Sequence, residues 1–449
     1  MADVGGLIAS AVSAPTGLWA IILNWLEGGI VNYGWVIIVF TLLVKVCLSP
    51  LDLLVRFTNK KATLVQQKVA PQVARINKKY QNDRATAQMQ TNALYKKEGY
   101  NAVASCLVMI VNLAVTLVVF FTLFASLREM SAYRAINQYE AIQTSYMSTL
   151  STQTQNKVIE RLNGLDVVYV KGADEQITSE AVSGYETSFK LIFEGDGANP
   201  ESVGIFDNYF AINGELTEEQ QNYLNNHFIE YNAESGESTS FLDMLSALTT
   251  ESSEAATIEA NKTWNEVKEN WLWVDNIWVA DNYKSPLPTY SDLKKLASDS
   301  KNSEYVSYVN NIDKDLYSVI TTSVHNQDDR WNGYFILAIL AGVTAFLSQY
   351  ITELMSKSKN KEVNKFVEQS NPAGGAMKFM KILLPVLMII FVLTSSAAFS
   401  IYIVASQIIS IGISALTSVI VNACYKKKQQ EVYEALEKEA LRSMRKHKK

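Results

Sequence analysis

The sequence predicts an α-helical polytopic membrane protein with five transmembrane helices, a cytoplasmic αα-hairpin and an inserted extracytoplasmic domain that is mainly helical α+β. Five apolar stretches approach the roughly 20 residues that a helix needs to cross a bilayer. The segment from Glu129 to Arg330 carries 13 basic and 33 acidic residues, whereas the remainder carries 27 and 12. An acidic segment therefore lies between two basic, apolar parts of the chain. This uneven distribution of charge is more informative about the organisation of the chain than the net charge of -5.

The N-terminal part is predicted to approach the membrane from outside. Residues 1–30 form an extracytoplasmic N-terminus with an interfacial helix, because Leu18–Leu26 is short, carries two tryptophans and ends at glycines. The first span follows at 31–54. We expect this span to be kept in the mature protein and not cleaved, since the N-terminus lacks a signal-peptide pattern.

A cytoplasmic helical hairpin is predicted at residues 55–101. Its composition favours helix throughout, except at Gln81–Asp83, where turn-forming residues separate two arms. Pro71 should kink or break the first arm. The second span follows at 102–127.

The acidic extracytoplasmic domain is assigned to residues 128–331, which is long enough to bury a core. Four segments within it have legible patterns: Ser131–Asn163, Gln220–Leu248 and Ile258–Trp271 are predicted as helix, and Leu165–Val170 as strand.

The C-terminal part is predicted to hold the remaining spans. They are the third at 332–353, the fourth at 380–396 and the fifth at 398–424, with a cytoplasmic loop at 354–379 and a basic tail at 425–449 that extends the last helix. The hairpin, the loop and the tail are all rich in lysine and arginine. The positive-inside rule therefore places the N-terminus outside and the C-terminus in the cytoplasm.

No pattern of catalytic residues is found. The histidines His227, His325 and His447 are isolated, no spacing of ligands indicates a metal site, and no phosphate-binding glycine loop is present. The three cysteines lie in or beside apolar runs and imply no disulfide framework. We therefore expect a protein that is not an enzyme, uses no cofactor and binds no DNA.

Lys45 is the most informative single residue. It lies fourteen residues into the first apolar run and about 9 Å before its cytoplasmic end at Leu51. A cation near mid-bilayer costs roughly 2.5–3.5 kcal/mol, so it usually faces water or a partner. The alternative is that its long side chain reaches the inner interface by snorkelling. Spacing does not decide between these readings.

Other polar residues lie in the predicted spans, and each alone has an ordinary explanation as a contact between helices. Together with Lys45 they are predicted to line a hydrophilic groove: Asn112, Thr116, Thr344, Ser348, Gln349, Ser396 and Gln407. A wet, positively charged recess would attract acidic residues and ease the passage of short polar tails.

The hairpin carries a basic set that is predicted to recruit partners: Lys60, Lys61, Lys68, Arg75, Lys78 and Lys79. These cations also satisfy the positive-inside rule and suit anionic lipid. Contact with ribosomal RNA or emerging chains is the second reading, since such clusters bind phosphate without sequence preference.

A distributed set of residues resembles the YidC/Oxa family of membrane protein insertases. In the first span and hairpin the set includes Trp35, Lys45, Pro50-Leu51, Pro71, Ile76, Lys79-Tyr80 and Asp83, continuing through Leu94–Gly99, Asn101, Cys106-Leu107 and Asn112. It resumes at Trp271–Val274, Asp281, Leu340–Thr344, Phe346-Leu347, Met380-Lys381, Pro385 and Tyr402. These residues occur in the same order as in the family, and the resemblance covers roughly half of the chain.

The resemblance implies an insertase that works without ATP hydrolysis. Its first core span carries a cation, usually arginine, facing a groove open to cytoplasm and lipid but closed outside, and Lys45 occupies that position. Lysine offers a point charge where arginine offers a bidentate fork. The implied partners are nascent membrane proteins, membrane lipids, the ribosome through the basic tail, and the Sec translocon, in a bacterial plasma membrane.

Two departures from the family are visible. Ala102 and Val108 stand where prolines are usual, and roughly 140 residues are inserted between about Glu129 and Asn270.

Two rival functions stay open: a channel or secondary transporter, and a receptor acting through the acidic domain. The lack of an internal repeat weighs against a transporter.

Overall fold

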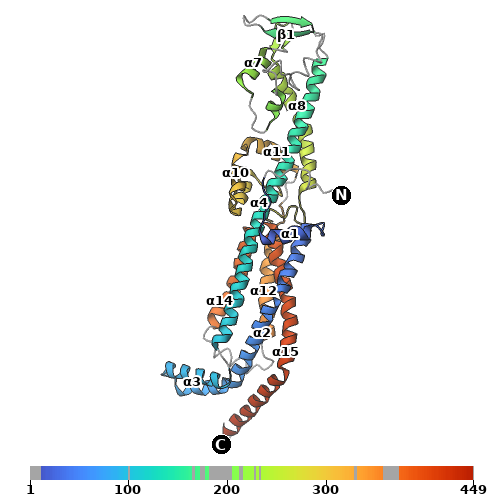
Figure 1. The fold of residues 1–449 in the computed structure, drawn as a ribbon. Helices are drawn as coiled ribbons and strands as arrows, with labels where there is room; N and C mark the ends of the chain where they lie inside the picture. Colours follow the sequence, from blue (N-terminus) through green and yellow to red (C-terminus); the bar gives the residue numbers. More distant parts are fainter. Residues whose placement is uncertain are drawn as a thin grey trace.

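The computed structural model describes residues 12–447, except 100–101, 164–166, 172–176, 182–204, 212–215, 227–228, 232–233, 328–330 and 357–373. The molecule is elongated, with a helical bundle at one end and a helical stalk that leads to a distal domain (Figure 1). We call the two ends of the bundle the stalk end and the hairpin end. A helical hairpin and the C-terminal helix project from the hairpin end.

The N-terminal helices are α1 (Leu18–Glu27), α2 (Tyr33–Lys79) and α3 (Arg84–Lys97). Helix α2 begins where the Asn32 side chain accepts the backbone N–H of Gly34, and α3 where Asp83 accepts that of Thr86. These caps satisfy donors that the first turn of a helix leaves unpaired. Helix α3 folds back on α2, so the predicted hairpin is present, with its turn at Tyr80–Asn82.

Of the two outcomes predicted for Pro71, a kink or a break, the break is not found. Helix α2 runs without a break through both Pro50 and Pro71. The first arm is therefore a direct continuation of the first apolar run. Val65, Val69 and Val73 pack against Leu94 and Tyr95 of α3, and this contact holds the first arm in place on both sides of Pro71.

The remaining bundle helices are α4 (Ala102–Asn163), α12 (Ile336–Ser356), α14 (Gly374–Leu393) and α15 (Ala397–His447). Helix α15 packs along α2 and α12, and α12 also packs against α14. Helix α15 continues past the predicted fifth span into the basic tail, as expected. Helix α4 leaves the bundle without interruption and becomes the stalk (Figure 1).

Within the described residues, three helices are long and apolar enough to cross a membrane. They contain residues 33–79, 107–161 and 397–434. Two shorter apolar helices, Leu18–Glu27 and Ile336–Ile351, accompany them. The short length of Leu18–Glu27 agrees with an interfacial position rather than a crossing.

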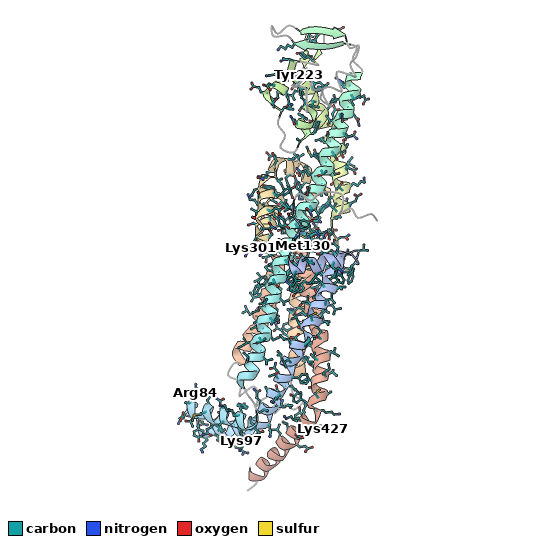
Figure 2. The ribbon with its side chains drawn as sticks, in the orientation of Figure 1. Arg84, Lys97, Met130, Tyr223, Lys301 and Lys427 are labelled. Carbon is teal, nitrogen blue, oxygen red and sulfur yellow. The ribbon has the colours of Figure 1, made fainter. Side chains whose placement is uncertain are left out.

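The stalk and distal domain are mainly helical. Helix α8 (Phe241–Val267) packs beside α4, and the small elements at the far end are α6 (Ile205–Phe210), α7 (Glu218–Asn226), β1 (Val167–Lys171), β2 (Ile177–Ala181), β3 (Glu230–Tyr231) and β4 (Ser238–Thr239). Strands β1 and β2 pair antiparallel, with Tyr169 opposite Ser179, and β3 pairs antiparallel with β4. Tyr223 marks this distal region in Figure 2.

A second helical group lies nearer the bundle. It comprises α9 (Tyr290–Ser300), α10 (Ser303–Asn311) and α11 (Lys314–Gln327). Helix α9 begins with a capping box in which Thr289 and Asp292 satisfy each other's backbone N–H groups. Tyr139, Tyr305 and Tyr317 are buried where this group packs on α4.

Two helix predictions in the acidic domain were partly wrong. Residues 220–248 are not one helix, because the β3–β4 pair separates α7 from α8. The helix expected over Ile258–Trp271 ends at Val267. The strand predicted at Leu165–Val170 corresponds to β1, and the helix at Ser131–Asn163 is the outer part of α4.

Candidate functional site: a bundle sealed at one end

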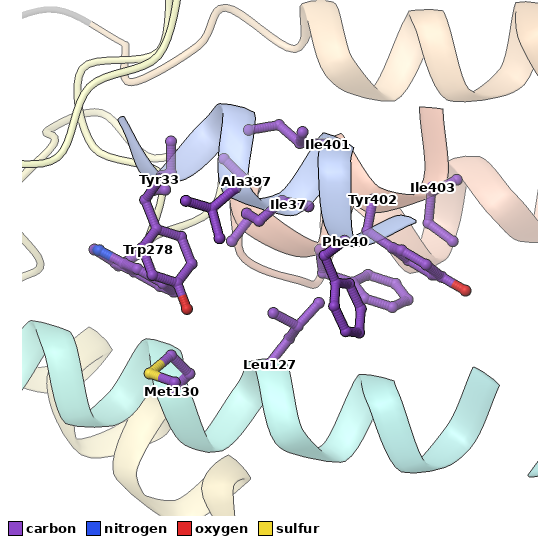
Figure 3. Packing of buried hydrophobic residues seen from close by; sticks show 14 of the residues in the cluster. Tyr33, Ile37, Phe40, Leu127, Met130, Trp278, Ala397, Ile401, Tyr402 and Ile403 are labelled. Carbon is purple, nitrogen blue, oxygen red and sulfur yellow. The ribbon is translucent and has the colours of Figure 1, made fainter. Parts of the chain in front are cut away.

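The bundle is tightly packed at its stalk end. In α2, Tyr33, Val36, Ile37 and Phe40 are buried, and they meet Leu127 and Met130 of α4 and Ile401–Ile403 of α15 (Figure 3). Trp278 from the connecting segment completes this core and lies against Tyr33, with ring centroids 4.7 Å apart. Buried side chains therefore fill this end of the bundle along the described residues.

A charged cluster reinforces the closed end. Arg134 of α4 contacts Glu27 at 2.6 Å and Glu269 at 3.1 Å. Its guanidinium also lies over the rings of Tyr33 and Trp278, at 5.3 and 5.6 Å from their centroids. We call these five residues the seal cluster. It joins α1, α2, α4 and the 268–283 segment through one side chain.

Burial and charge act against each other within the seal cluster. Burial raises the pKa of Glu269, and the nearby Arg134 charge opposes that rise. A carboxylate in this position is costly unless a cation stays beside it. Arg134 therefore offsets this cost for Glu269 and at the same time pairs with the more exposed Glu27.

Backbone contacts fix the 268–283 segment across the end of the bundle. The first amides of α15, at Ala397 and Ala398, donate to the carbonyls of Val279 and Ile277 at 2.8 and 2.7 Å. The carboxylate of Asp281 accepts the N–H of Leu337 at 3.0 Å, at the start of α12. Two helix N-termini are thus satisfied by this one segment. Burial raises the pKa of Asp281, which is fully enclosed.

The hairpin end of the bundle is packed differently. Between residues 42 and 61, α2 has no buried residue, and α4 has none between 107 and 122. In α12, burial stops after Ala345 along the described residues. In α15 it becomes intermittent after Ser406. The helices are therefore held together at the stalk end and present free surface towards the hairpin.

Lys45 lies on α2 one turn beyond the packed region. Its side chain is half-buried, and it forms no hydrogen bond or ion pair with the described part of the chain. Thr41, one turn earlier on the same side, is fully buried and bonds to its own helix. Lys45 thus stands at the border between the sealed and the open part of the bundle.

Four predicted groove residues lie in the open part. Asn112, Ser348, Gln349 and Gln407 are half-buried, on α4, α12 and α15. The amide nitrogen of Gln349 is enclosed and has no partner in the described structure. Thr116 is exposed on α4.

Two predicted groove residues lie in the packed part instead. Thr344 is buried and donates to the carbonyl of Leu340 in its own helix at 2.7 Å. Ser396 is buried at the stalk end, where it accepts a hydrogen bond from Ser131 of α4 at 2.8 Å. Both hydroxyls are satisfied inside the protein, so these two residues contribute to packing.

Sequence reasoning missed a polar strip on α15 and its counterpart on α2. Serines recur at every fourth position from Ser406 to Ser418, which places them in one row along the helix. Arg56 of α2 donates to two of them, Ser414 and Ser418, the latter at 3.2 Å. The four-residue serine repeat was visible in the sequence and could have revealed this row.

The hairpin presents its basic set at the end opposite the stalk, where Figure 2 labels Arg84 and Lys97. Lys68 pairs with Glu98 of the facing arm, and Lys79 lies 5.2 Å from the ring of Tyr80. A cavity of ≈ 480 Å³ lies between the arms, lined by Gln72, Arg75, Ile76, Gln90, Ala93, Leu94 and Lys97. Lys60 is half-buried on α2, whereas Lys61 and Lys78 are exposed on the same helix.

The fold and this site define a class: a helical membrane protein whose bundle is closed at one end, open at the other and extended by a basic hairpin. Residues 25–170 match the family model described as the 60Kd inner membrane protein. This match confirms the resemblance to the YidC/Oxa family inferred from the sequence.

Several relatives are named membrane protein insertase YidC. One from Aromatoleum aromaticum is 30% identical over 124 residues, which cover 28% of this chain and 21% of the relative. One from Neisseria gonorrhoeae is 35% identical over 105 residues, covering 23% and 18%. One from Leptospira interrogans is 38% identical over 84 residues, covering 19% and 13%.

The matched part spans about a fifth or less of the length of these relatives. No solved structure matches the chain.

Proposed function

We propose that this protein is a membrane protein insertase that guides client proteins into the bilayer without ATP hydrolysis. The observation that carries the proposal is the contrast within one bundle: a closed stalk end, and a loosely packed hairpin end with Lys45 at the border. The names of the relatives support the same activity.

The proposed orientation places the hairpin and the tail in the cytoplasm and the acidic domain outside. Five helices would then cross the membrane: the first parts of α2, α4 and α15, together with α12 and α14. The basic composition of the hairpin end supports this direction. The domain boundaries predicted from the sequence belong to the same proposal.

In the proposed mechanism, a client's polar tail enters the open part of the bundle from the cytoplasm. Lys45 attracts acidic groups, and Asn112, Ser348, Gln349 and Gln407 offer hydrogen bonds in place of water. Partial hydration lowers the cost of holding a polar segment inside the membrane. The client's hydrophobic segment meanwhile passes sideways into lipid, where its transfer is favourable.

The sealed end of the bundle argues against a channel as the function of this protein. A channel needs a continuous polar path, whereas the seal cluster and the apolar core around Phe40 cross the bundle. We propose nascent membrane proteins as clients, recruited through the basic hairpin. Contacts of the tail with the ribosome, and of the bundle with the Sec translocon and lipids, complete the proposed set of partners.

Reconstitution tests this function directly. The purified protein in liposomes should insert a single-span reporter with an acidic tail well above the level in empty liposomes. Lys45→Gln should lower that insertion by about tenfold, the cost of one charged contact of about 1.4 kcal/mol. Lys45→Arg should retain it. Insertion no greater than in empty liposomes would refute the proposal.

A further inference from the structure

Asp52 is a carboxylate on the same face of α2 as Lys45. Seven residues separate the two positions, so they lie within about 20° of each other around the helix and about 10 Å apart along it. Asp52 is nearer the hairpin end and is half-buried. It interacts electrostatically with Lys45 on one side and with Arg56 on the other.

Arg56 does not neutralise Asp52 by direct pairing. Its guanidinium donates to the hydroxyls of Ser414 and Ser418 on α15. In the described part of the chain, Asp52 itself has no hydrogen bond and no ion pair. Arg56 therefore joins α2 to α15, and the carboxylate of Asp52 stays available.

This face of α2 thus carries two charges of opposite sign, in a fixed order along the helix. A cation, Lys45, lies deeper in the bundle, next to the sealed part, and an anion, Asp52, lies towards the opening. A client segment that enters from the opening meets Asp52 first and reaches Lys45 only with its leading residues. An extended chain advances about 3.3 Å per residue, so the spacing corresponds to about three residues of client.

We propose that Asp52 is a specificity-determining residue that pairs with a basic residue trailing the client's leading acidic group. The preferred client tail then carries a carboxylate first and a cation about three residues behind it, by the spacing above. A tail with the two charges in the opposite order meets like charges at both positions. This inference rests on the proposed insertase function and adds the charge order of its substrate.

The test uses the full chain in liposomes and three single-span reporters. Their tails differ only at two positions three residues apart: Asp leading Lys, Lys leading Asp, or Asn and Gln in their place. The wild-type protein should insert the Asp-leading reporter about three- to fivefold better than the Lys-leading one, as expected for one partly solvated ion pair. Asp52→Asn should abolish this preference, and Asp52→Glu should retain it.

Glu431→Gln is the matched control, because it removes the same charge from an exposed position on the tail helix. It should behave as the wild type. Insertion of all three reporters without an order preference, or a preference that survives in Asp52→Asn, would overturn the inference and leave the insertase function standing. Loss of all insertion in both Asp52→Asn and Asp52→Glu would also overturn it, since Asp52 would then be structural. Failure of the wild type with every reporter would instead refute the insertase function, and this inference with it.

Discussion

Arg134 shows how a single residue closes the stalk end of the bundle. It contacts carboxylates from α1 and from the 268–283 segment, and two aromatic rings cover its guanidinium. Nothing in its sequence context, within a polar helix of the acidic insertion, distinguishes it from an exposed arginine. Only the fold brings its partners together, from positions more than 100 residues away.

Substituting Arg134 should loosen the seal. Arg134→Gln leaves Glu27 and Glu269 facing each other without a cation, which should cost about 2–3 kcal/mol, somewhat less than for a fully buried pair. The loss should appear as a lower midpoint of thermal unfolding in detergent. Arg128→Gln, which removes a more exposed arginine paired with Asp299, is the control and should change the midpoint little. Equal midpoints for the two variants would exclude this role of Arg134.

Asp83 gives the hairpin a pH dependence that can be measured. Hydrogen bonds from the side chain and the backbone of Thr86 lower the pKa of this carboxyl below its usual value. The folded pKa is depressed, so the stabilisation is present above a pH of about 4 and is lost as the pH falls through the folded pKa. The protection factors of the α3 amides, which are exchange rates corrected for the intrinsic rate at each pH, should therefore fall on acidification.

Asp83→Asn is the matched control for that measurement. Asparagine caps a helix about as well as aspartate but does not titrate in this range. Its amide exchange in α3 should lack the acid-dependent step. A step of the same size in both proteins would show that Asp83 is not its source.

At the scale of helices, small residues set how closely neighbours approach. A Cβ placed on Gly342 of α12 would lie 2.6 Å from the Cδ1 atom of Ile389 on α14. Gly412 of α15, by contrast, has open space where its Cβ would lie. Glycine thus has a packing role at Gly342, between α12 and α14, that it lacks at Gly412.

Gly342→Ala should therefore destabilise the bundle through crowding, by about 1 kcal/mol after Ile389 shifts. Gly412→Ala should be neutral or slightly stabilising, because alanine favours helix more than glycine does. Thermal unfolding of the two variants in the same detergent compares them. A Gly342→Ala protein at least as stable as Gly412→Ala would contradict the packing argument.

At the scale of the whole molecule, the outer half of the stalk and the distal domain form a core separate from the bundle. Phe241, Leu245 and Trp264 of α8 are buried in it, together with Ile142 of α4. The seal cluster and the tyrosine-rich core lie closer to the bundle, on the α4 residues before Glu140. A deletion that begins at Ser131 would remove Arg134 and Tyr139, so a shorter deletion is the informative one.

Replacing residues 147–261 by a short turn should leave insertion intact. Helices α4 and α8 come together at Ser145 and Thr263, whose hydroxyls are 2.8 Å apart, so a turn joins them at that level. The shortened protein should insert reporters at a rate within about twofold of the wild type, a difference of about 0.4 kcal/mol. Loss of insertion in a folded protein of this kind would favour the receptor reading, in which the acidic domain carries the function.

The sequence predicted most of the elements because their signals are local. Apolar runs identified the helices of the bundle, and the turn at Gln81–Asp83 separated α2 from α3. Pro71 does not break α2, because tertiary contacts of Val69 and Val73 hold the helix on either side of it. The seal cluster could not be predicted, since it depends on long-range contacts. Ser396 was assigned to the groove for its polarity alone, but its partner Ser131 lies far away in sequence.

The central claim is that position 45 faces water from one side only, and thiol labelling tests it. Lys45→Cys would be prepared with Cys47, Cys106 and Cys424 replaced by serine, and Leu43→Cys, on an outward-facing and exposed position of α2, is the control. A membrane-impermeant maleimide should label Lys45→Cys from the hairpin side, and neither variant from the stalk side. An unreactive Lys45→Cys, or one labelled from both sides, would contradict a groove that opens at the hairpin end and is sealed at the other.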